Sequence, residues 1–432
     1  MKLATPARVD TPLAIGSMTV AGRLFKSATS ETRADHDGFV TEELLDFYRP
    51  MFAVGTPMVV TGNLYVSRQG KSAGRQAGID HDDKIPGLRQ WVSLAHAGGT
   101  KLIAQLNHGG RQISRALPGE RIVSASGVRE PMYGSKPAPL NVEEIRDVVQ
   151  SFVAAARRAH DAGFDGVQVH AAHGYLLSQF LTPHTNRRLD AYGGPLENRA
   201  RLVREVVSGI RDELPDFPLL VKINGTDDLP FRKGATTDEL IQVARWLEDA
   251  GADAIEVSRG HYESWPGMVQ GHYRGFLRNA IERGLLAKVS PGRKVALRAV
   301  APVVERIAER LRPPVEGFNL AFAERFATAL DVPVICVGGF HTPEGISAAI
   351  TNGRVDAISA ARAFIADPHL YVNTVGPRAA DVPVCGYCNV CIATFSTTAI
   401  DCGSADIRGR RDLMIASRAA APAAASPSKE NK

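Results

Sequence analysis

Residues 166–175 read Gly-Val-Gln-Val-His-Ala-Ala-His-Gly-Tyr, a short apolar run that ends in two histidines and a tyrosine. The β-branched residues favour a strand, and the glycine that follows favours a turn. We therefore predict a buried strand, Gly166–His170, with chemically useful side chains at its carboxyl end. The preceding segment, Val142–Ala162, carries apolar residues at helical spacing after Asn141, which predicts a helix with a side-chain cap.

The same alternation of a short apolar run and a helical pattern recurs along the chain. The runs predicted as strands are Phe25–Ser27, Met58–Gly62, Lys101–Leu106, Gly166–His170, Leu219–Ile223, Ala254–Val257, Pro333–Val337 and Asp356–Ala360. Further helices are predicted at Arg199–Arg211, Thr237–Ala250 and Pro343–Asn352. Eight buried strands with intervening helices predict an α/β fold. At this length a (β/α)8 TIM barrel is favoured over an open doubly wound sheet.

The predicted barrel domain, residues 1–380, carries additions that a plain barrel lacks. A basic helical segment, residues 275–315, is inserted between the sixth and seventh strands. A Cys-rich lobe follows the barrel at residues 381–412. The chain ends in an Ala/Pro/Ser tail, residues 413–432, for which the low complexity from residue 418 onward predicts disorder.

Composition excludes several classes of protein. The 432 residues are 44% hydrophobic and 22% charged, which is ordinary for a globular chain. No run approaches the roughly 18 apolar residues of a membrane span. The N-terminus has no signal pattern, so we expect a cytoplasmic protein. A homo-oligomer is also expected.

The positive charge is concentrated in one segment. Ten Lys and Arg against three acids give residues 272–312 a charge of +7, whereas the whole chain has +5. The segment has no strong aromatic interleaving, so no nucleic-acid partner is expected. Its apolar residues at helical spacing predict a lid over the substrate, a dimer contact, an amphipathic helix on anionic lipid, or a helical excursion that packs on the barrel.

Polar side chains stand at the predicted carboxyl ends of the strands, where TIM barrels place their active sites. They are Gln105, His170, His173, Lys222, Gly338, Gly339, Ala361 and Arg362. This set of amide, imidazole and cationic groups with a Gly-rich turn suits a phosphorylated ring cofactor and a carbonyl substrate. A different class of enzyme remains open, because a His-x-x-His pair can bind a metal in barrel lyases and hydrolases, with Asp227 or Glu256 as weak candidates for an acidic ligand.

Two long motifs resemble the old yellow enzyme family. They are residues 170–183 (HAAHGYLLSQFLTP) and 185–199 (TNRRLDAYGGPLENR), and residues 22–28 (GRLFKSA) add to the match. The resemblance runs from about Thr11 to His369. It is greatest to the N-terminal domain of the 2,4-dienoyl-CoA reductase and trimethylamine dehydrogenase type. It implies an FMN-binding (β/α)8 barrel with an N-terminal hairpin and NADH or NADPH as reductant.

The resemblance also implies roles for individual residues. His170 and His173 would bind the carbonyl oxygen of an α,β-unsaturated carbonyl or dienoyl substrate. Flavin would give a hydride to the β-carbon, and Tyr175, a phenol with an ordinary pKa of ~10, would protonate the α-carbon. The cofactor contacts implied are Ser27, Ala28, Thr29, Ser30, Gly62, Gln105, Lys222, Gly338, Gly339, Ala361 and Arg362. Ala361 departs from the family, which has Gly there.

Four cysteines gather near the C-terminus: Cys385, Cys388, Cys391 and Cys402. Their spacing resembles the [4Fe–4S] segment of the larger relatives. A cluster there would pass electrons from FMN to an external partner, as in an FMN dehydrogenase or demethylase that works oxidatively. Structural zinc or no metal at all are the alternatives. In a third reading, a flavin-free binding protein would recruit partners through this lobe and the basic segment.

Overall fold

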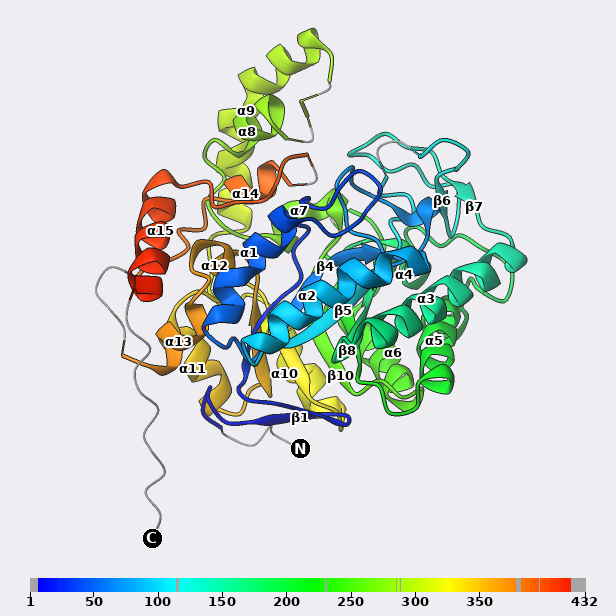
Figure 1. Cartoon of the computed structure of the whole chain (residues 1–432). Coiled ribbons are helices and arrows are strands. Elements are labelled where there is room, and N and C mark those ends of the chain that lie inside the picture. The colour runs from blue at the N-terminus through cyan, green and yellow to red at the C-terminus, as the bar shows by residue number, and fades with distance from the viewer. Residues whose placement is uncertain are drawn as a thin grey trace.

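The computed structural model describes residues 7–113, 116–229, 231–284, 286–287, 289–377, 382–395 and 397–420. Eight parallel strands close into one barrel in the order β10-β11-β12-β3-β4-β5-β8-β9, and helices cover its outer surface (Figure 1). The strands are β3 (Leu24–Lys26), β4 (Met58–Tyr65), β5 (Lys101–Asn107), β8 (Gly166–Ala171), β9 (Leu219–Asn224), β10 (Ala254–Ser258), β11 (Val334–Val337) and β12 (Ala357–Ala360). Each predicted strand overlaps an observed one, so the TIM-barrel prediction is confirmed.

The helices around the barrel follow their sequence signals. They are α1 (Glu42–Ala53), α2 (Ile85–Ala97), α3 (Val142–Ala162), α4 (Leu176–Leu181), α5 (Leu196–Glu213), α6 (Thr237–Asp249), α10 (Leu320–Ala329), α11 (Pro343–Thr351), α12 (Arg362–Ala366) and α13 (Leu370–Val375). Helix α3 has the predicted bounds because Asn141 and Glu144 form a reciprocal capping box at its start. Short pieces outside this frame are η1 (Arg68–Gly70), η2 (Asp82–Lys84) and the paired strands β6 (Val123–Ser124) and β7 (Ala138–Pro139).

The N-terminal hairpin closes one end of the barrel. Its antiparallel strands, β1 (Leu13–Ile15) and β2 (Met18–Val20), lie below the barrel (Figure 1). Their buried side chains form one apolar cluster with residues that point into the barrel, such as Phe25 and Ile103. Because apolar packing fills this end, a cavity for a ligand is left to the opposite end, where the strands terminate.

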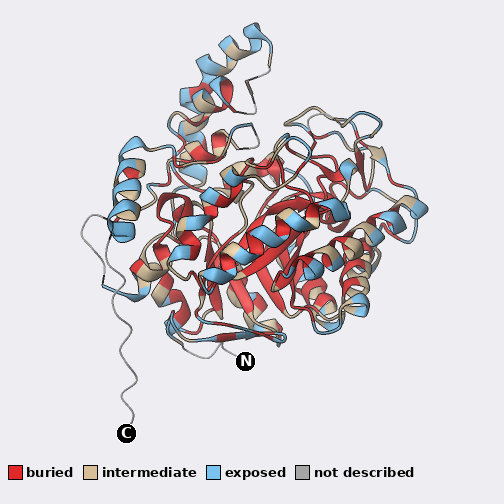
Figure 2. Ribbon diagram, viewed as in Figure 1, coloured by how far each residue is buried: buried red, intermediate tan, exposed pale blue. Residues whose placement is uncertain are grey.

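The inserted segment is helical and rises from that opposite end. It follows η3 (Tyr262–Ser264) and α7 (Trp265–Met268) and contains α8 (Phe276–Glu282) and α9 (Pro291–Leu311) (Figure 1). Much of α9 is exposed (Figure 2). Exposed apolar residues on α9 include Val300, Val303, Val304, Ile307 and Leu311. The predicted helical insertion is confirmed, whereas its contact with lipid or a second copy stays a prediction. No helix in the described ranges combines the length and apolar character needed to cross a bilayer.

The end of the described chain differs from the prediction. Helix α14 (Val390–Ala393) lies in the Cys-rich lobe, and α15 (Ala405–Ala420) extends through the first part of the segment predicted to be disordered. Disorder was therefore wrong for residues 413–420. Ala is a strong helix former, Ile407 is buried on the helix, and Arg418 donates a hydrogen bond to Asn373 of α13. Residues 421–432 and the predicted domain boundary at 380 lie outside the described residues.

Candidate active site

A cavity opens at the carboxyl end of the barrel, between the strand ends and a roof made by the insertion and the Cys-rich lobe. Almost the whole predicted set of site residues lines it: Ser27, Ala28, Thr29, Ser30, Gln105, His170, His173, Tyr175, Lys222, Gly338, Gly339, Ala361 and Arg362. These residues come from every part of the barrel sequence, and only its closure brings them to one place.

Gly62 is the exception, and it lies outside the lining of the cavity. Strand β4 has an irregularity between Val60 and Asn63, where the Gly62 amide donates a hydrogen bond to the Glu31 carboxylate at 2.7 Å. Glu31 occupies the space where a Cβ would stand, so a larger residue at position 62 would displace this carboxylate. The irregularity turns Asn63 toward the cavity, a lining residue that the sequence did not reveal.

The floor of the cavity is a hydrogen-bonded charge network centred on Glu256. This carboxylate lies 3.2 Å from Lys222 Nζ and accepts hydrogen bonds from Ser27 at 2.9 Å and from Ser359 at 2.5 Å. Lys222 and Glu256 are 3% and 1% exposed, so each charge depends on the other for compensation. Glu256 was a weak candidate for a metal ligand, and the structure shows it as the counter-ion of Lys222.

Amide side chains extend the floor toward Gln105. Gln168 donates to Glu256 at 2.5 Å, and Gln105 Nε2 donates to Gln168 at 2.7 Å. The amide of Gln105 is therefore held in one orientation by a partner that lies deeper in the barrel. Gln168 was not predicted as part of the site, and Glu256 was predicted only as a weak candidate for a metal ligand. Both alternate with outward-facing apolar residues on their strands, and that alternation is the one signal that could have revealed them.

The two histidines meet above the floor. His170 Nε2 lies 2.9 Å from His173 Nδ1, while His170 Nδ1 lies 3.1 Å from Asn107 Oδ1 and His173 Nε2 lies 2.7 Å from Ser258 Oγ. Burial and the nearby Lys222 charge lower the pKa of His173 to about 3, and burial also lowers the pKa of His170. Both imidazoles are neutral at pH 7 and can act as hydrogen-bond donors without carrying charge.

Tyr175 stands beside this pair. Its ring centroid is 4.9 Å from that of His170, and its hydroxyl is hydrogen-bonded to Asn63. Burial raises the pKa of Tyr175 above the ordinary value of a phenol, so the hydroxyl keeps its proton throughout the physiological range.

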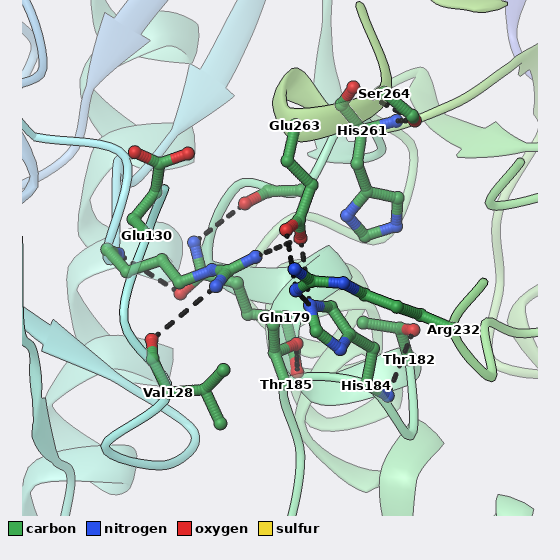
Figure 3. A network of polar contacts seen from close by, with 12 residues as sticks. Val128, Glu130, Gln179, Thr182, His184, Thr185, Arg232, His261, Glu263 and Ser264 are labelled. Carbon is green, nitrogen blue, oxygen red and sulfur yellow. Dashed lines mark hydrogen bonds and ion pairs between the residues drawn. The ribbon is translucent and has the colours of Figure 1, made fainter. Parts of the chain in front are cut away.

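A buried polar network around Glu263 of η3 (Figure 3) lies next to the loop that carries His173. Glu263 pairs with His184 at 3.0 Å and accepts hydrogen bonds from Arg111 and Arg232. Burial opposes ionisation, but His184 and Arg111 together lower the pKa of Glu263 to about 2. The neighbouring Tyr262 amide donates to the His173 carbonyl at 3.3 Å, and this supports the left-handed backbone of His173, with φ of 61°.

The opposite end of the cavity is shared between the barrel and the Cys-rich lobe. Arg362 Nη1 donates to the Gln270 carbonyl at 2.9 Å and also to Asn389 Oδ1, and the guanidinium lies 5.1 Å from the centroid of the Tyr387 ring. Gly339 has φ of 74°, which favours glycine there. The sequence predicted Arg362 as a phosphate ligand but did not reveal that the lobe positions it.

The roof is apolar and largely aromatic. Trp265 and Phe276 stack with ring centroids 4.2 Å apart and planes 8° from parallel. Other roof residues that line the cavity are Leu277, Leu286, Ile392 and Phe395. A flat apolar ligand would find stacking partners here and polar partners below.

The lining fits FMN by its donor set. A buried ammonium and an oriented amide on the floor suit the polar edge of the flavin, and the strand-end amides with Arg362 suit its phosphate. A bound metal is not supported in the same way. Within the described residues, no three or more His, Cys, Asp or Glu side chains are grouped so that they could hold a metal ion.

The four cysteines lie close together without forming such a ligand set. Cys385, Cys391 and Cys402 pack in an apolar cluster with Ile365 and Ile400, and Cys385 also lines the cavity. Burial raises the pKa of these three thiols, and the cysteines add to the effect by acting on one another. None of the four forms a disulfide. The fifth cysteine, Cys336, is buried in β11.

Comparison with known proteins identifies the family. Residues 9–275 match the model of the NADH:flavin oxidoreductase / NADH oxidase family. The chain belongs to this family. The predicted membership of the old yellow enzyme family is thereby confirmed.

Individual relatives cover the chain to different extents. The NADH oxidase of Thermoanaerobacter brockii is 30% identical over 405 residues, which are 92% of this chain and 56% of the relative. The 4,4'-dithiodibutanoate disulfide reductase of Rhodococcus erythropolis is 30% identical over 92% of this chain and 95% of its own length. Among solved structures, 2-naphthoyl-CoA reductase in complex with 2-naphthoyl-CoA matches with a TM-score of 0.77 and 26% identity, covering 94% of this chain and 58% of that one. The chain thus spans little more than half of two of these proteins.

Proposed function

We propose that the protein is an FMN-dependent NAD(P)H oxidoreductase that reduces the C=C bond of an α,β-unsaturated carbonyl or dienoyl compound. One observation carries this proposal: two neutral imidazoles and a protonated phenol face the same cavity, above a floor that holds the buried Lys222 ammonium. This arrangement offers hydrogen bonds to a substrate oxygen and a proton to a neighbouring carbon.

FMN, when bound, supplies hydride transfer between the nicotinamide and the substrate. The residues that would hold it are Gln105 and Lys222 at the ring, and Gly338, Gly339, Ala361 and Arg362 at the phosphate. Lys222 favours negative charge on the ring edge, and Glu256 limits how strongly it does so. Arg362 is already oriented by Gln270 and Asn389, so it loses little side-chain freedom when it binds a phosphate.

The histidines and Tyr175 would serve the substrate. A carbonyl oxygen placed between His170 and His173 would receive two N–H donors as negative charge develops on it, which is the role of an oxyanion hole. Tyr175 adjoins this position and holds its proton at neutral pH, so it can act as the general acid at carbon. The neutral imidazoles stabilise charge on oxygen without giving up a proton of their own.

The roof favours a flat apolar substrate. Trp265, Phe276 and Phe395 present ring surfaces to the cavity. 2-Naphthoyl-CoA reductase is named for an aromatic acyl thioester. The relative named for a disulfide points to another acceptor, for which no α-carbon needs a proton. Flavin reoxidation by matched unsaturated carbonyls and disulfides will separate these substrate classes.

Tyr175→Phe tests the proposal directly. We expect flavin reduction by NADH or NADPH to be retained and alkene reduction to fall by roughly 10²-fold or more, the usual contribution of a positioned acid. Stopped-flow absorbance measures the two half-reactions separately. Unchanged alkene turnover would show that the proton comes from another group, and a protein that stays colourless with saturating FMN would overturn the proposal as a whole.

The oxidative alternative, in which a [4Fe–4S] cluster relays electrons to an external partner, rests on the cysteines alone. Their thiols lie in one lobe beside the cavity but are not arranged as ligands. Iron and acid-labile sulfide analysis of anaerobically purified protein decides the matter. Four irons per chain would restore this alternative, and their absence from protein made with ample iron would remove it.

A further inference from the structure

Four side chains form an unbranched chain of polar contacts across the proposed oxygen site. Asn107 contacts His170 Nδ1, His170 Nε2 contacts His173 Nδ1, and His173 Nε2 contacts Ser258 Oγ, at 3.1, 2.9 and 2.7 Å. Asn107 and Ser258 are the last residues of β5 and β10, and both are buried. The two imidazoles therefore have a fixed partner at each outer nitrogen and face each other at the inner ones.

The number of protons on the two imidazole rings limits which hydrogen bonds this series of contacts can form. Each neutral imidazole carries one N–H and one lone pair. When the inner nitrogens contact each other, one must donate and the other must accept. When a substrate oxygen lies between them, both must donate. The two states therefore need different tautomers, and one ring has to change.

The two end members of the series, Asn107 and Ser258, show which ring changes its tautomer. A serine hydroxyl can donate to His173 Nε2, which leaves the proton of His173 on Nδ1, facing the site. His173 then donates to His170 Nε2, and His170 donates from Nδ1 to the Asn107 carbonyl. Every contact seen in the structure is satisfied by this single arrangement. Among the described residues, it leaves the buried Asn107 Nδ2 without a hydrogen-bond partner.

We propose that Ser258 and Asn107 are positioning residues that set the tautomers of the histidine pair. This inference rests on the proposed function, in which the pair binds a substrate oxygen. Ser258 holds His173 as the Nδ1–H tautomer in both states. When an oxygen enters, the Asn107 amide turns so that Nδ2 donates to His170 Nδ1, and the proton of His170 moves to Nε2. Its net charge is unchanged, because one N–H bond breaks and one forms on the same ring, with exchange through solvent or the ligand hydroxyl.

The surroundings favour a change of tautomer over a change of ring position. The backbone of His173 is held at both ends, because its amide donates to Asn224 at 3.2 Å and its carbonyl accepts from Gln112 at 2.8 Å. The Asn107 side chain, in contrast, has a buried donor, Nδ2, that makes no hydrogen bond among the described residues. Turning that amide replaces one hydrogen bond by another, because Nδ2 then donates to His170 Nδ1, where Oδ1 had accepted from it. The contact at the far end of the series is therefore kept when an oxygen ligand binds.

Holoenzyme labelled with 15N-histidine tests the inference, with para-chlorophenol as a probe that mimics the developing oxyanion. In wild-type protein we expect His173 to remain Nδ1–H with and without the phenol, and His170 to change from Nδ1–H to Nε2–H on binding. Ser258→Ala should populate the Nε2–H form of His173 and weaken phenol binding about three- to tenfold, the equivalent of one neutral hydrogen bond. Ser258→Thr keeps the hydroxyl and should restore both properties.

Asn107→Leu should weaken phenol binding by a similar factor and leave the His173 tautomer unchanged. The flavin absorbance of this variant should show that FMN is still bound. If Ser258→Ala alters neither the tautomer nor the affinity, or if His170 keeps one tautomer throughout, the inference is overturned while the proposed function stands. If the wild-type holoenzyme binds no phenol, the proposed function fails. In that case the tautomer of His173 in ligand-free Ser258→Ala protein still decides whether Ser258 sets it.

Discussion

The floor and the roof of the cavity are built on different physical principles. On the floor, barrel strands hold Lys222, Glu256 and Gln105 in one connected network of buried polar groups. In the roof, Trp265 comes from α7, and Phe276 and other apolar residues come from the insertion and the Cys-rich lobe. A buried charge network is costly to disturb, because removing one member leaves another uncompensated, whereas an apolar wall tolerates changes of shape. We infer that the floor sets the chemistry and the roof sets the choice of substrate.

The largest effect is expected on the floor, from Glu256→Gln. Lys222 would then lie buried without its counter-ion, so the free energy of unfolding should fall by ~3–5 kcal/mol, measured by urea denaturation of the apoprotein. Asp238→Asn, which breaks an exposed pair with Arg325, is the control and should cost less than ~1 kcal/mol.

A double-mutant cycle sharpens this test. Lys222→Met combined with Glu256→Gln should recover part of the loss, because neither charge is then left alone. Additive losses would mean that the two side chains do not compensate each other and that the floor is not one network.

The next largest effect is expected in the roof, from Trp265→Ala. Loss of the stacked ring should lower kcat/KM for a bulky aromatic enone by ~10–100-fold, the range for a lost apolar contact of about 1–3 kcal/mol. The value for a small enone should change little, and FMN should remain bound. Steady-state kinetics with both substrates measures the difference.

Val303→Ala is the matched control for the roof. It lies on the exposed side of α9, with 62% exposure, and should change kcat/KM for neither substrate. If Trp265→Ala lowers kcat/KM equally for both substrates, or releases the flavin, the inference that the roof sets the choice of substrate is wrong.

The smallest effect concerns the pH dependence of phenol binding, in which we expect no step from the titration of the two histidines. The pKa of His173 is lowered to about 3, and that of His170 is also lowered, so neither gains a proton between pH 8 and pH 5. Phenol binding should therefore weaken with falling pH only as the phenolate itself is protonated, with no step near ~6.5, the ordinary pKa of histidine. A flavin charge-transfer titration across this range measures it. A step near that value would mean that the pair is charged in the free enzyme.

Much of the site could be predicted because its residues lie at or near the carboxyl ends of parallel strands. His170, His173 and Tyr175, together with Lys222 and Gln105, all line the cavity. The interpretation failed where a partner lies far away in the sequence. Gly62 lies outside the lining of the cavity, and its amide contacts Glu31. Nothing in the sequence pattern indicates Asn107 or Ser258, because only the closed barrel places them beside the histidines.

The tail shows the same limit in the fold. Its composition predicted disorder from residue 413, yet α15 continues to Ala420, because tertiary contacts such as that of Arg418 with Asn373 stabilise residues of high helix propensity. Local composition does not include those contacts.

The sequence by itself determined the barrel, since hydrophobic periodicity and helix caps act over a few residues and can be read locally. It also determined which side chains would stand at the strand ends. The tertiary structure alone decided the counter-ion of Lys222, the partners of the two histidines and the aromatic roof. These depend on the three-dimensional distance between residues up to hundreds of positions apart, and the closure of the barrel sets that distance.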